Sequence, residues 1–120
     1  MDDAELKLYL DTDKALERIR GNKKLFKTLL THFLATRAQY EQLKQEMGAN
    51  DHDSAAKTVH AIKGVAANLS MAKLYDQSVE VEAILKKSAS DTAEVMASFG
   101  DAFEKTMKQV EDLLQSSFFD

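Results

Sequence analysis

Cysteine, proline and tryptophan are absent from the chain, and only four of its 120 residues are glycine. Because there is no cysteine, the chain can form neither a disulfide nor a thiolate-ligated metal site, which suits the reducing cytoplasm. Because proline is absent and glycine is scarce, few residues are available for tight turns or sheet edges. Alanine, leucine, lysine, glutamate and glutamine are abundant instead, and all of them favour helices. The composition therefore predicts an all-α protein.

The chain also lacks a long apolar run and a surplus of positive charge. Its first twenty residues are acidic and mixed, with neither the basic-then-apolar order of a signal peptide nor the length of apolar sequence that spans a bilayer. The formal net charge is −4, and the lysines are interleaved with acidic residues. Nucleic-acid binding needs a concentrated basic surface, so we expect neither a nucleic acid nor a membrane as a partner. We expect a cytoplasmic protein that binds other proteins.

The length suits one core, with 44% hydrophobic residues to fill it and 30% charged residues to solvate its surface. We therefore expect a single domain over residues 1–120. Apolar residues recur at helical spacing in five segments that are separated by short breaks. The first segment covers about 11–20 and stops at Gly21. The second is one long helix that runs from a cap at Asn22 until Gly48 ends it.

Three further helices follow in the pattern. The third opens at about 50–53, Ser70 offers a cap for the fourth, and Asp91 with Glu94 resembles a capping box for the fifth. The apolar stripes of the last four helices contain Phe26, Leu29, Leu30, Phe33, Leu34, Leu43, Ala55, Val59, Ile62, Ala66, Leu69, Leu74, Ser78, Val81, Leu85, Phe99, Phe103, Val110 and Leu114. These stripes are buried most simply in an antiparallel up-down-up-down four-helix bundle, to which the short first helix is an addition.

The third segment carries a glycine inside its predicted helix. Gly64 costs the helix about 1 kcal/mol relative to alanine, so we expect the position to need empty space. Gly64 lies one turn after His60, and Ala56 lies one turn before it. With the apolar stripe facing the core, helical steps of about 100° place His60 on the outer surface between these small neighbours. A large group could therefore approach the imidazole closely.

Lys63 lies three residues after His60 and projects beside it on the same helix surface. A neutral imidazole nitrogen is a competent nucleophile near pH 7, and it gives up a phosphoryl group readily. A lysine ammonium balances the charge of such a dianionic group without competing for it, because the lysine stays protonated. The residue types therefore fit reversible phosphorylation of His60.

The same segment contains a continuous motif, His60-x-x-Lys63-Gly64 followed by Ala66, Ala67, Asn68 and Leu69. This motif resembles the signature of histidine-containing phosphotransfer (HPt) domains. The resemblance covers nearly the whole chain, because Gly21-Asn22 and the helix after it are similar to the second-helix pattern of the family, and residues 74–82 are similar to its fourth. One position departs from the pattern, since family members commonly carry glycine where this chain has Ser70.

The resemblance implies a multistep phosphorelay, in which a receiver domain's phosphoaspartate passes its phosphoryl group to His60, and His60 hands it to a second receiver. The catalytic acids and the Mg²⁺ would belong to the receivers. The chain itself would hold no cofactor or metal, and it would be no enzyme, having no ATP or kinase site of its own. The implied partners are response-regulator receiver domains and a hybrid sensor kinase. We expect a monomer, because the chain has enough helices to close a bundle alone.

The resemblance also implies roles for individual residues. Lys63 would stabilise the phosphorylated state, and Gly64 would admit the active-site loop of the receiver. Ala56 and Ala67 would join the docking face. The family often holds an acid or an amide at the position of Glu82, which would orient the imidazole.

Two other interpretations stay open. A helical adaptor could bind signalling proteins without covalent chemistry. The dimerisation region of a sensor kinase also bears a histidine on a helix, but such regions are helical hairpins that pair to form a bundle. An ATP-dependent enzyme has little support, because the chain contains no Walker-type loop and no glycine-rich nucleotide motif.

The other two histidines lack the setting of a site. His32 and His52 have no lysine and no small residues arranged around them, so we expect both to be structural or solvated. His52 stands between Asp51 and Asp53, but three adjacent residues at a helix start seldom converge on one ion. We therefore expect no metal site there.

Overall fold

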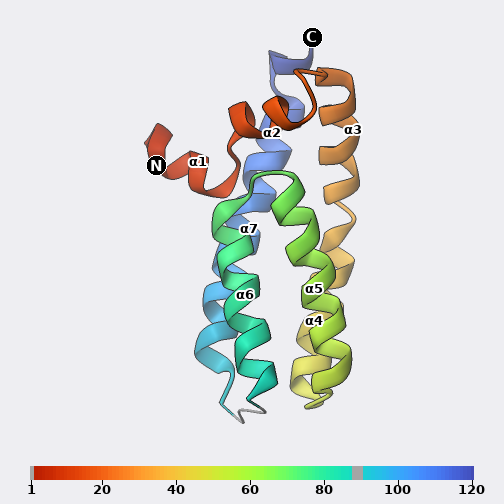
Figure 1. Cartoon of the computed structure of the whole chain (residues 1–120), viewed down its shortest axis with the longest axis vertical. Helices are drawn as coiled ribbons and strands as arrows, with labels where there is room; N and C mark the ends of the chain where they lie inside the picture. The colour runs from red at the N-terminus through yellow and green to blue at the C-terminus, as the bar shows by residue number, and fades with distance from the viewer. Residues whose placement is uncertain (1, 88–90) are drawn as a thin grey trace.

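Helices make up the regular secondary structure of the described chain. The computed structural model describes residues 2–87 and 91–120 (Figure 1). Its elements are α1 (Asp3–Tyr9), α2 (Thr12–Arg18), α3 (Lys23–Phe33), α4 (Thr36–Gly48), α5 (His52–Asn68), α6 (Ala72–Lys86), α7 (Ala93–Gln115) and a 3₁₀ helix (Ser117–Phe119). None of the helices in these residues is long and apolar enough to cross a membrane. The predicted all-α class is confirmed.

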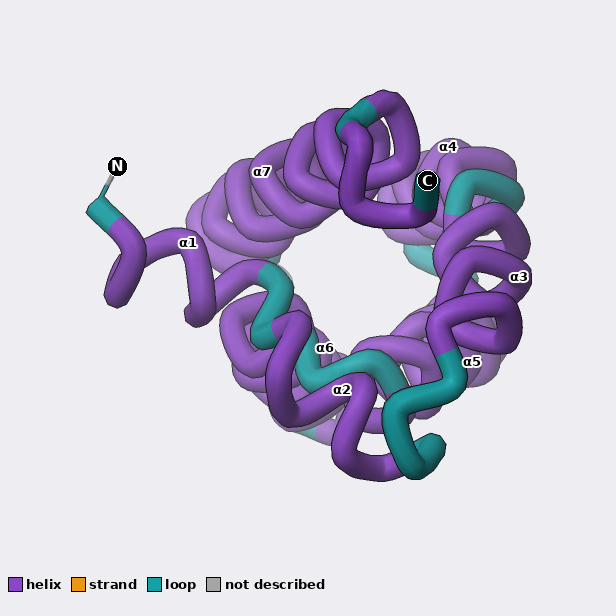
Figure 2. Tube along the Cα trace, turned by 90° about the horizontal axis from the view of Figure 1, so that it is seen from above, coloured by secondary structure: helices purple, strands orange, loops and turns teal. Residues whose placement is uncertain are grey.

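The long helices form the predicted antiparallel four-helix bundle, with α3 and α4 together as one of its arms. α4 packs on α5, α5 on α6 and α6 on α7, while α3 packs on α7. Figure 2 shows from above how these contacts close the helices into a ring. α2 lies across the end of the bundle where α5 turns into α6, and α1 lies beside it (Figure 1). The prediction places one short helix before the bundle, whereas the structure has two.

The core is built from the stripes that the spacing predicts. Four phenylalanines from α3 and α7 are among its largest fully buried side chains: Phe26, Phe33, Phe99 and Phe103. Fully burying a side chain of this kind stabilises the fold by about 1.5–3 kcal/mol. Of the predicted core residues, Leu29, Leu34 and Leu114 lie at the margin and are only partly buried. The stripes therefore fix how far each helix is rotated about its own axis.

A glycine in α7 allows two helices to approach closely. The ring of Tyr40 in α4 stacks on Phe103, with ring centroids 4.5 Å apart. A Cβ built on Gly100 would lie 2.5 Å from the Tyr40 hydroxyl oxygen. Any side chain at position 100 would therefore require the Tyr40 side chain to shift.

The prediction of one long helix between Asn22 and Gly48 is wrong. The helix breaks between α3 and α4, where the amide of Leu34 donates to the carbonyl of Thr31 at 3.2 Å, three residues back instead of four. The hydroxyl of Thr36 donates to the carbonyl of Phe33 at 2.6 Å and so takes up an acceptor that the break frees. Neither glycine nor proline marks the break, which is why the spacing alone does not show it.

Three helices end at a residue in the left-handed conformation that is not glycine. Arg20, Asn50 and Ser70 have φ values of 57°, 56° and 56°. After α5, the amide of Met71 donates back to the carbonyl of Ala66 at 2.9 Å, which is the six-to-one bond of a Schellman motif. The prediction that Ser70 caps the next helix is therefore wrong, because Ser70 closes α5 and α6 begins without a side-chain cap.

Side-chain caps begin three helices near the predicted positions. Oδ1 of Asp11, Asn22 and Asp51 accepts the backbone N–H three residues later, at 3.1, 3.0 and 3.3 Å. Such caps each stabilise a helix by about 1 kcal/mol.

The predicted capping box at the start of the last helix is wrong. α7 begins after Thr92, which makes no side-chain cap bond. Oδ1 of Asp91 accepts the amide of Ala93, two residues later, at 3.4 Å. Asp91 thus lies one position too early for the reciprocal bonds of a box with Glu94.

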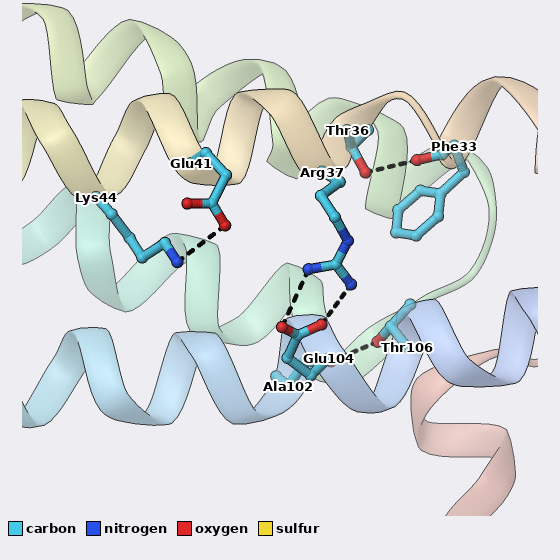
Figure 3. A network of polar contacts seen from close by, with 8 residues as sticks. All are labelled: Phe33, Thr36, Arg37, Glu41, Lys44, Ala102, Glu104 and Thr106. Atoms are coloured by element: carbon cyan, nitrogen blue, oxygen red, sulfur yellow. Dashed lines mark hydrogen bonds and ion pairs between the residues drawn. The ribbon is translucent and has the colours of Figure 1, made fainter.

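An ion pair joins α4 to α7 on the outside of the bundle. Arg37 donates two hydrogen bonds to the carboxylate of Glu104, at 3.1 and 2.5 Å (Figure 3). This bonding holds the pKa of Glu104 below its ordinary value and raises the pKa of Arg37. Both side chains are about half exposed, at 44% and 53%, so water and salt weaken the pair.

We predict that Ser70→Gly stabilises the protein. A side chain in the left-handed region costs about 1–2 kcal/mol, and glycine removes this cost. The greater conformational freedom of glycine in the unfolded chain offsets part of the stabilisation. The expected net increase in the free energy of unfolding is about 0.5–1 kcal/mol, measured by urea denaturation. Asn50→Gly is the control and should gain less, because asparagine tolerates this conformation. A loss of stability in Ser70→Gly would contradict the account of this turn.

We also predict that the Arg37–Glu104 pair loses its effect in acid. The pKa of Glu104 is lower in the folded than in the unfolded chain, so the contribution is present above the unfolded value of about 4.3 and is lost as the pH falls through the folded value. A double-mutant cycle with Arg37→Met and Glu104→Gln should give a coupling of about 0.5–1 kcal/mol at neutral pH. The same cycle near pH 3 should give almost none, and an unchanged coupling would refute the assignment.

Candidate functional site

His60 lies on the outer face of α5, where the spacing predicts it. Its neighbour Val59 and, two residues on, Ile62 are fully buried against the other helices. The side chain of His60 is 72% exposed. The rotation of α5 that buries the apolar stripe therefore turns the imidazole outward.

Small residues lie on both sides of the imidazole along this face of α5. Ala56 lies one turn before His60, and Gly64 and Ala67 follow at one and two turns after it. A Cβ built on Gly64 would meet no heavy atom within 4 Å. Packing within the fold therefore does not require glycine at this position, although alanine would favour the helix by about 1 kcal/mol.

A carboxylate from α6 reaches the same place. Oε1 of Glu82 lies 3.0 Å from Nζ of Lys63 and 3.5 Å from Nδ1 of His60. The side chains of Glu82 and Lys63 are 16% and 23% exposed, so this pair is far less accessible to water than the imidazole. A carboxylate in such a position is costly without a cation, and the Lys63 ammonium supplies one.

This geometry distinguishes the two ring nitrogens of His60. At 3.5 Å the contact with Glu82 is longer than a good hydrogen bond, but the carboxylate still favours a proton on Nδ1 over a lone pair there. With the proton on Nδ1, the lone pair of the neutral ring lies on Nε2. The arrangement therefore offers one nucleophilic nitrogen on an exposed ring, with a cation alongside.

The end of α5 is tied to α2 by a contact that the sequence does not indicate. Arg18 donates a hydrogen bond from its guanidinium to the carbonyl of Ala67, 49 residues away along the chain. Carbonyls in the last turn of a helix lose their regular partners, so a cation there is favourable. No periodicity or motif pairs these two positions.

The other histidines lie in different settings. His32 is exposed on α3, and His52 is the first residue of α5 and is partly buried. The ion pairs of the described residues place a carboxylate beside His60 but beside neither of the other two. Within residues 2–87 and 91–120, no group of three or more His, Cys, Asp or Glu side chains could hold a metal ion.

Comparisons with known proteins identify the fold and the family of the chain. The sequence model of the Hpt domain family matches residues 28–116. Among solved structures, the chain is similar to the HPT domain of a sensor hybrid histidine kinase from Shewanella, with 21% identity and a TM-score of 0.81. That alignment covers 92% of this chain and 98% of the other, and at this identity it shows a shared fold. No curated protein matches the chain significantly. The family match spans most of the bundle, and the chain therefore belongs to the Hpt domain family, which implies a histidine phosphotransfer role in a phosphorelay.

Proposed function

We propose that this chain carries a phosphoryl group on His60, accepting it from the aspartate of one receiver domain and passing it to the aspartate of another. The observation that supports the proposal most is the exposed imidazole with a shielded carboxylate 3.5 Å from its Nδ1 and a lysine on the same carboxylate. Membership of the Hpt domain family supports the phosphotransfer chemistry. The chain acts as a carrier, and the receivers contribute the metal and the catalytic acids.

The accepting step uses the lone pair of Nε2. The N–P bond forms as the bond between phosphorus and the aspartate oxygen breaks, and the aspartate leaves as a carboxylate. The ring keeps its proton on Nδ1 throughout, and Glu82 stabilises the positive charge that develops on the imidazole. Passing the phosphoryl group to the second receiver reverses these bond changes.

Lys63 and Gly64 fit this step in different ways. Phosphorylation brings a dianionic group to a surface that already holds the Glu82 carboxylate, so a nearby cation is needed to limit the repulsion. Lys63 is placed for this, because it starts three residues from His60 on the same helix and is held beside the ring by Glu82. The open surface above Gly64 leaves room for the receiver backbone.

We predict that His60 is the residue that takes up phosphate. After incubation with phosphoramidate, intact-mass spectrometry should show one acid-labile phosphoryl group on the wild type and none on His60→Gln. His32→Gln and His52→Gln are the controls and should be labelled like the wild type. Adding a receiver domain with Mg²⁺ should remove the label from the wild type.

Two results would count against this proposal. Labelling of His60→Gln would place the phosphoryl group elsewhere. A wild type that stays unlabelled, under conditions that label a known HPt domain, would favour the helical adaptor without covalent chemistry.

We predict that Gly64→Leu keeps the fold stable but slows phosphoryl transfer to a receiver. The position is open and helical, so the variant should be as stable as the wild type or more stable by about 0.5–1 kcal/mol. Transfer to a receiver should slow by at least about tenfold, because the side chain holds the reacting atoms apart. Gly48→Leu is the matched control, since a Cβ at that helical glycine also meets nothing within 4 Å. Equal transfer rates in the two variants would remove this explanation of Gly64.

A further inference from the structure

A long groove runs along the outside of the bundle between α6 and α7, which lie side by side (Figure 1). Two adjoining hollows form it, with volumes of about 380 and 390 Å³, and Ser98 lines both of them. On α6 the lining residues run from Lys73 to Ile84, which at about 1.5 Å per residue is a length of about 16 Å. The groove is therefore as long as about three turns of a helix.

The groove lies on the side of α6 that faces away from the proposed site. Figure 2 shows α6 between α5 and α7 in the ring of helices. Helical steps of about 100° place Glu82, which contacts His60, on one side of the buried stripe of α6, and Gln77, which lines the groove, on the opposite side. A molecule bound in the groove would therefore leave the imidazole accessible.

The floor of the groove offers apolar contact and close approach. Ile84 of α6 and Val95 of α7 line it and are only partly buried. Ala83, Ala97 and Ser98 line it as well, and they are exposed. Because these three side chains are short, the backbone of a partner helix can come close to α6 and α7.

The half of the groove nearest the end of α6 is strongly acidic. Three carboxylates line it: Glu80, Asp91 and Glu94. No lysine or arginine is among the lining residues of this half, and the ion pairs found within residues 2–87 and 91–120 include none of the three carboxylates. Like charges gathered around one hollow repel each other, and a cation placed between them would relieve this repulsion.

The fold gives a reason for two of these carboxylates but not for the third. Asp91 and Glu94 lie at the start of α7, where the helix dipole favours negative charge. Glu80 lies in the middle of α6, and the residues three and four positions away from it include no lysine or arginine. The charge of Glu80 therefore stabilises neither end of its helix and pairs with no neighbour along it.

The other half of the groove contains a buried acceptor that lacks a donor. Oε1 of Gln77 is buried, and within the described residues no group donates a hydrogen bond to it. Gln77 lines this half together with Lys73 and Asp101. An unpaired buried acceptor is unfavourable, and a donor from a bound partner would remove that cost. Both halves of the groove thus favour a partner that brings hydrogen-bond donors and positive charge.

A cationic amphipathic helix meets these requirements together. Its apolar face would pack on Ile84 and Val95, and lysine or arginine side chains at its margins would reach the carboxylates. An extended peptide would need the edge of a sheet for its backbone hydrogen bonds, and the part of the chain that the structure describes contains no strand. A nucleic acid would be repelled by the same carboxylates.

We infer that the groove between α6 and α7 docks a cationic amphipathic helix of a partner protein. The inference goes beyond the proposed function and does not depend on it. Because the groove and His60 lie on opposite sides of α6, this partner can stay bound while His60 exchanges phosphoryl groups with receivers. The groove would thus hold the carrier beside another protein.

The test measures binding of a fluorescent synthetic helix of about fourteen residues, with leucine on one face and lysine on the other, by fluorescence anisotropy. The wild type should bind one peptide per chain, with an affinity that falls as salt is added. The double variant Glu80→Gln/Glu94→Gln should bind at least about tenfold more weakly. Glu17→Gln/Glu111→Gln is the matched control, because it removes two exposed carboxylates elsewhere and leaves the same net charge. This control should bind like the wild type.

A second pair of variants tests the shape of the groove without changing its charge. Ser98→Trp should fill the point where the two hollows meet and weaken binding by at least about tenfold. Gln45→Trp, at an exposed position on α4, is its control and should bind like the wild type. Phosphoryl transfer from His60 to a receiver should proceed at the same rate with and without saturating peptide.

Three results would overturn the inference. The first is a wild type that does not bind the peptide. The second is equal affinity in the two double variants, which would mean that the peptide responds only to net charge. The third is slower transfer to the receiver when the peptide is bound, which would place the peptide on the face of His60. None of these results would change the assignment of His60 as the carrier, which phosphoramidate labelling tests separately.

Discussion

The burial of one side of α5 is the constraint on which the remaining features depend. α5 lies between α4 and α6, and its stripe from Ala55 to Ala66 is fully buried against them. A helix has one rotation about its axis that achieves this, and a change of 100° would put charged residues in the core and apolar ones in water. Once the rotation is set, His60 has to face outward and Lys63 has to lie toward α6. The position of the site is therefore a consequence of core packing.

The contact between α5 and α6 brings charged side chains to His60. Glu82 is shielded from water, and Lys63 at 3.0 Å is the nearer of its two partners, with His60 at 3.5 Å. In the proposed function a dianionic group would arrive next to this carboxylate, and the same lysine would have to serve both anions. Repulsion by Glu82 would then destabilise the phosphorylated state, whereas attraction by Lys63 would stabilise it. A phosphoryl carrier has to release the group as well as accept it, and these two opposing interactions suit both steps.

The sequence predicts the parts of the structure that follow from periodicity and misses those that follow from local backbone geometry. The bundle, its core and the outward position of His60 come from apolar spacing, which persists over many residues. The break after Phe33 has no glycine or proline to mark it, and it is made by short-range bonds and the hydroxyl of Thr36. The turn at Ser70 is misread for a similar reason, because serine suggests a cap and here stands where glycine is usual. Glu82 enters the prediction only through the family resemblance, since its contact with His60 joins two helices.

Two glycines inside helices show why a residue type alone does not reveal its use. Gly64 and Gly100 both weaken their helices by about the same amount. At Gly100 the reason is internal, because the Tyr40 hydroxyl occupies the space that a side chain would need. At Gly64 the space is empty, so packing within the fold gives no reason for the glycine. In the proposed function, this glycine one turn from an exposed histidine leaves room for the receiver that approaches there.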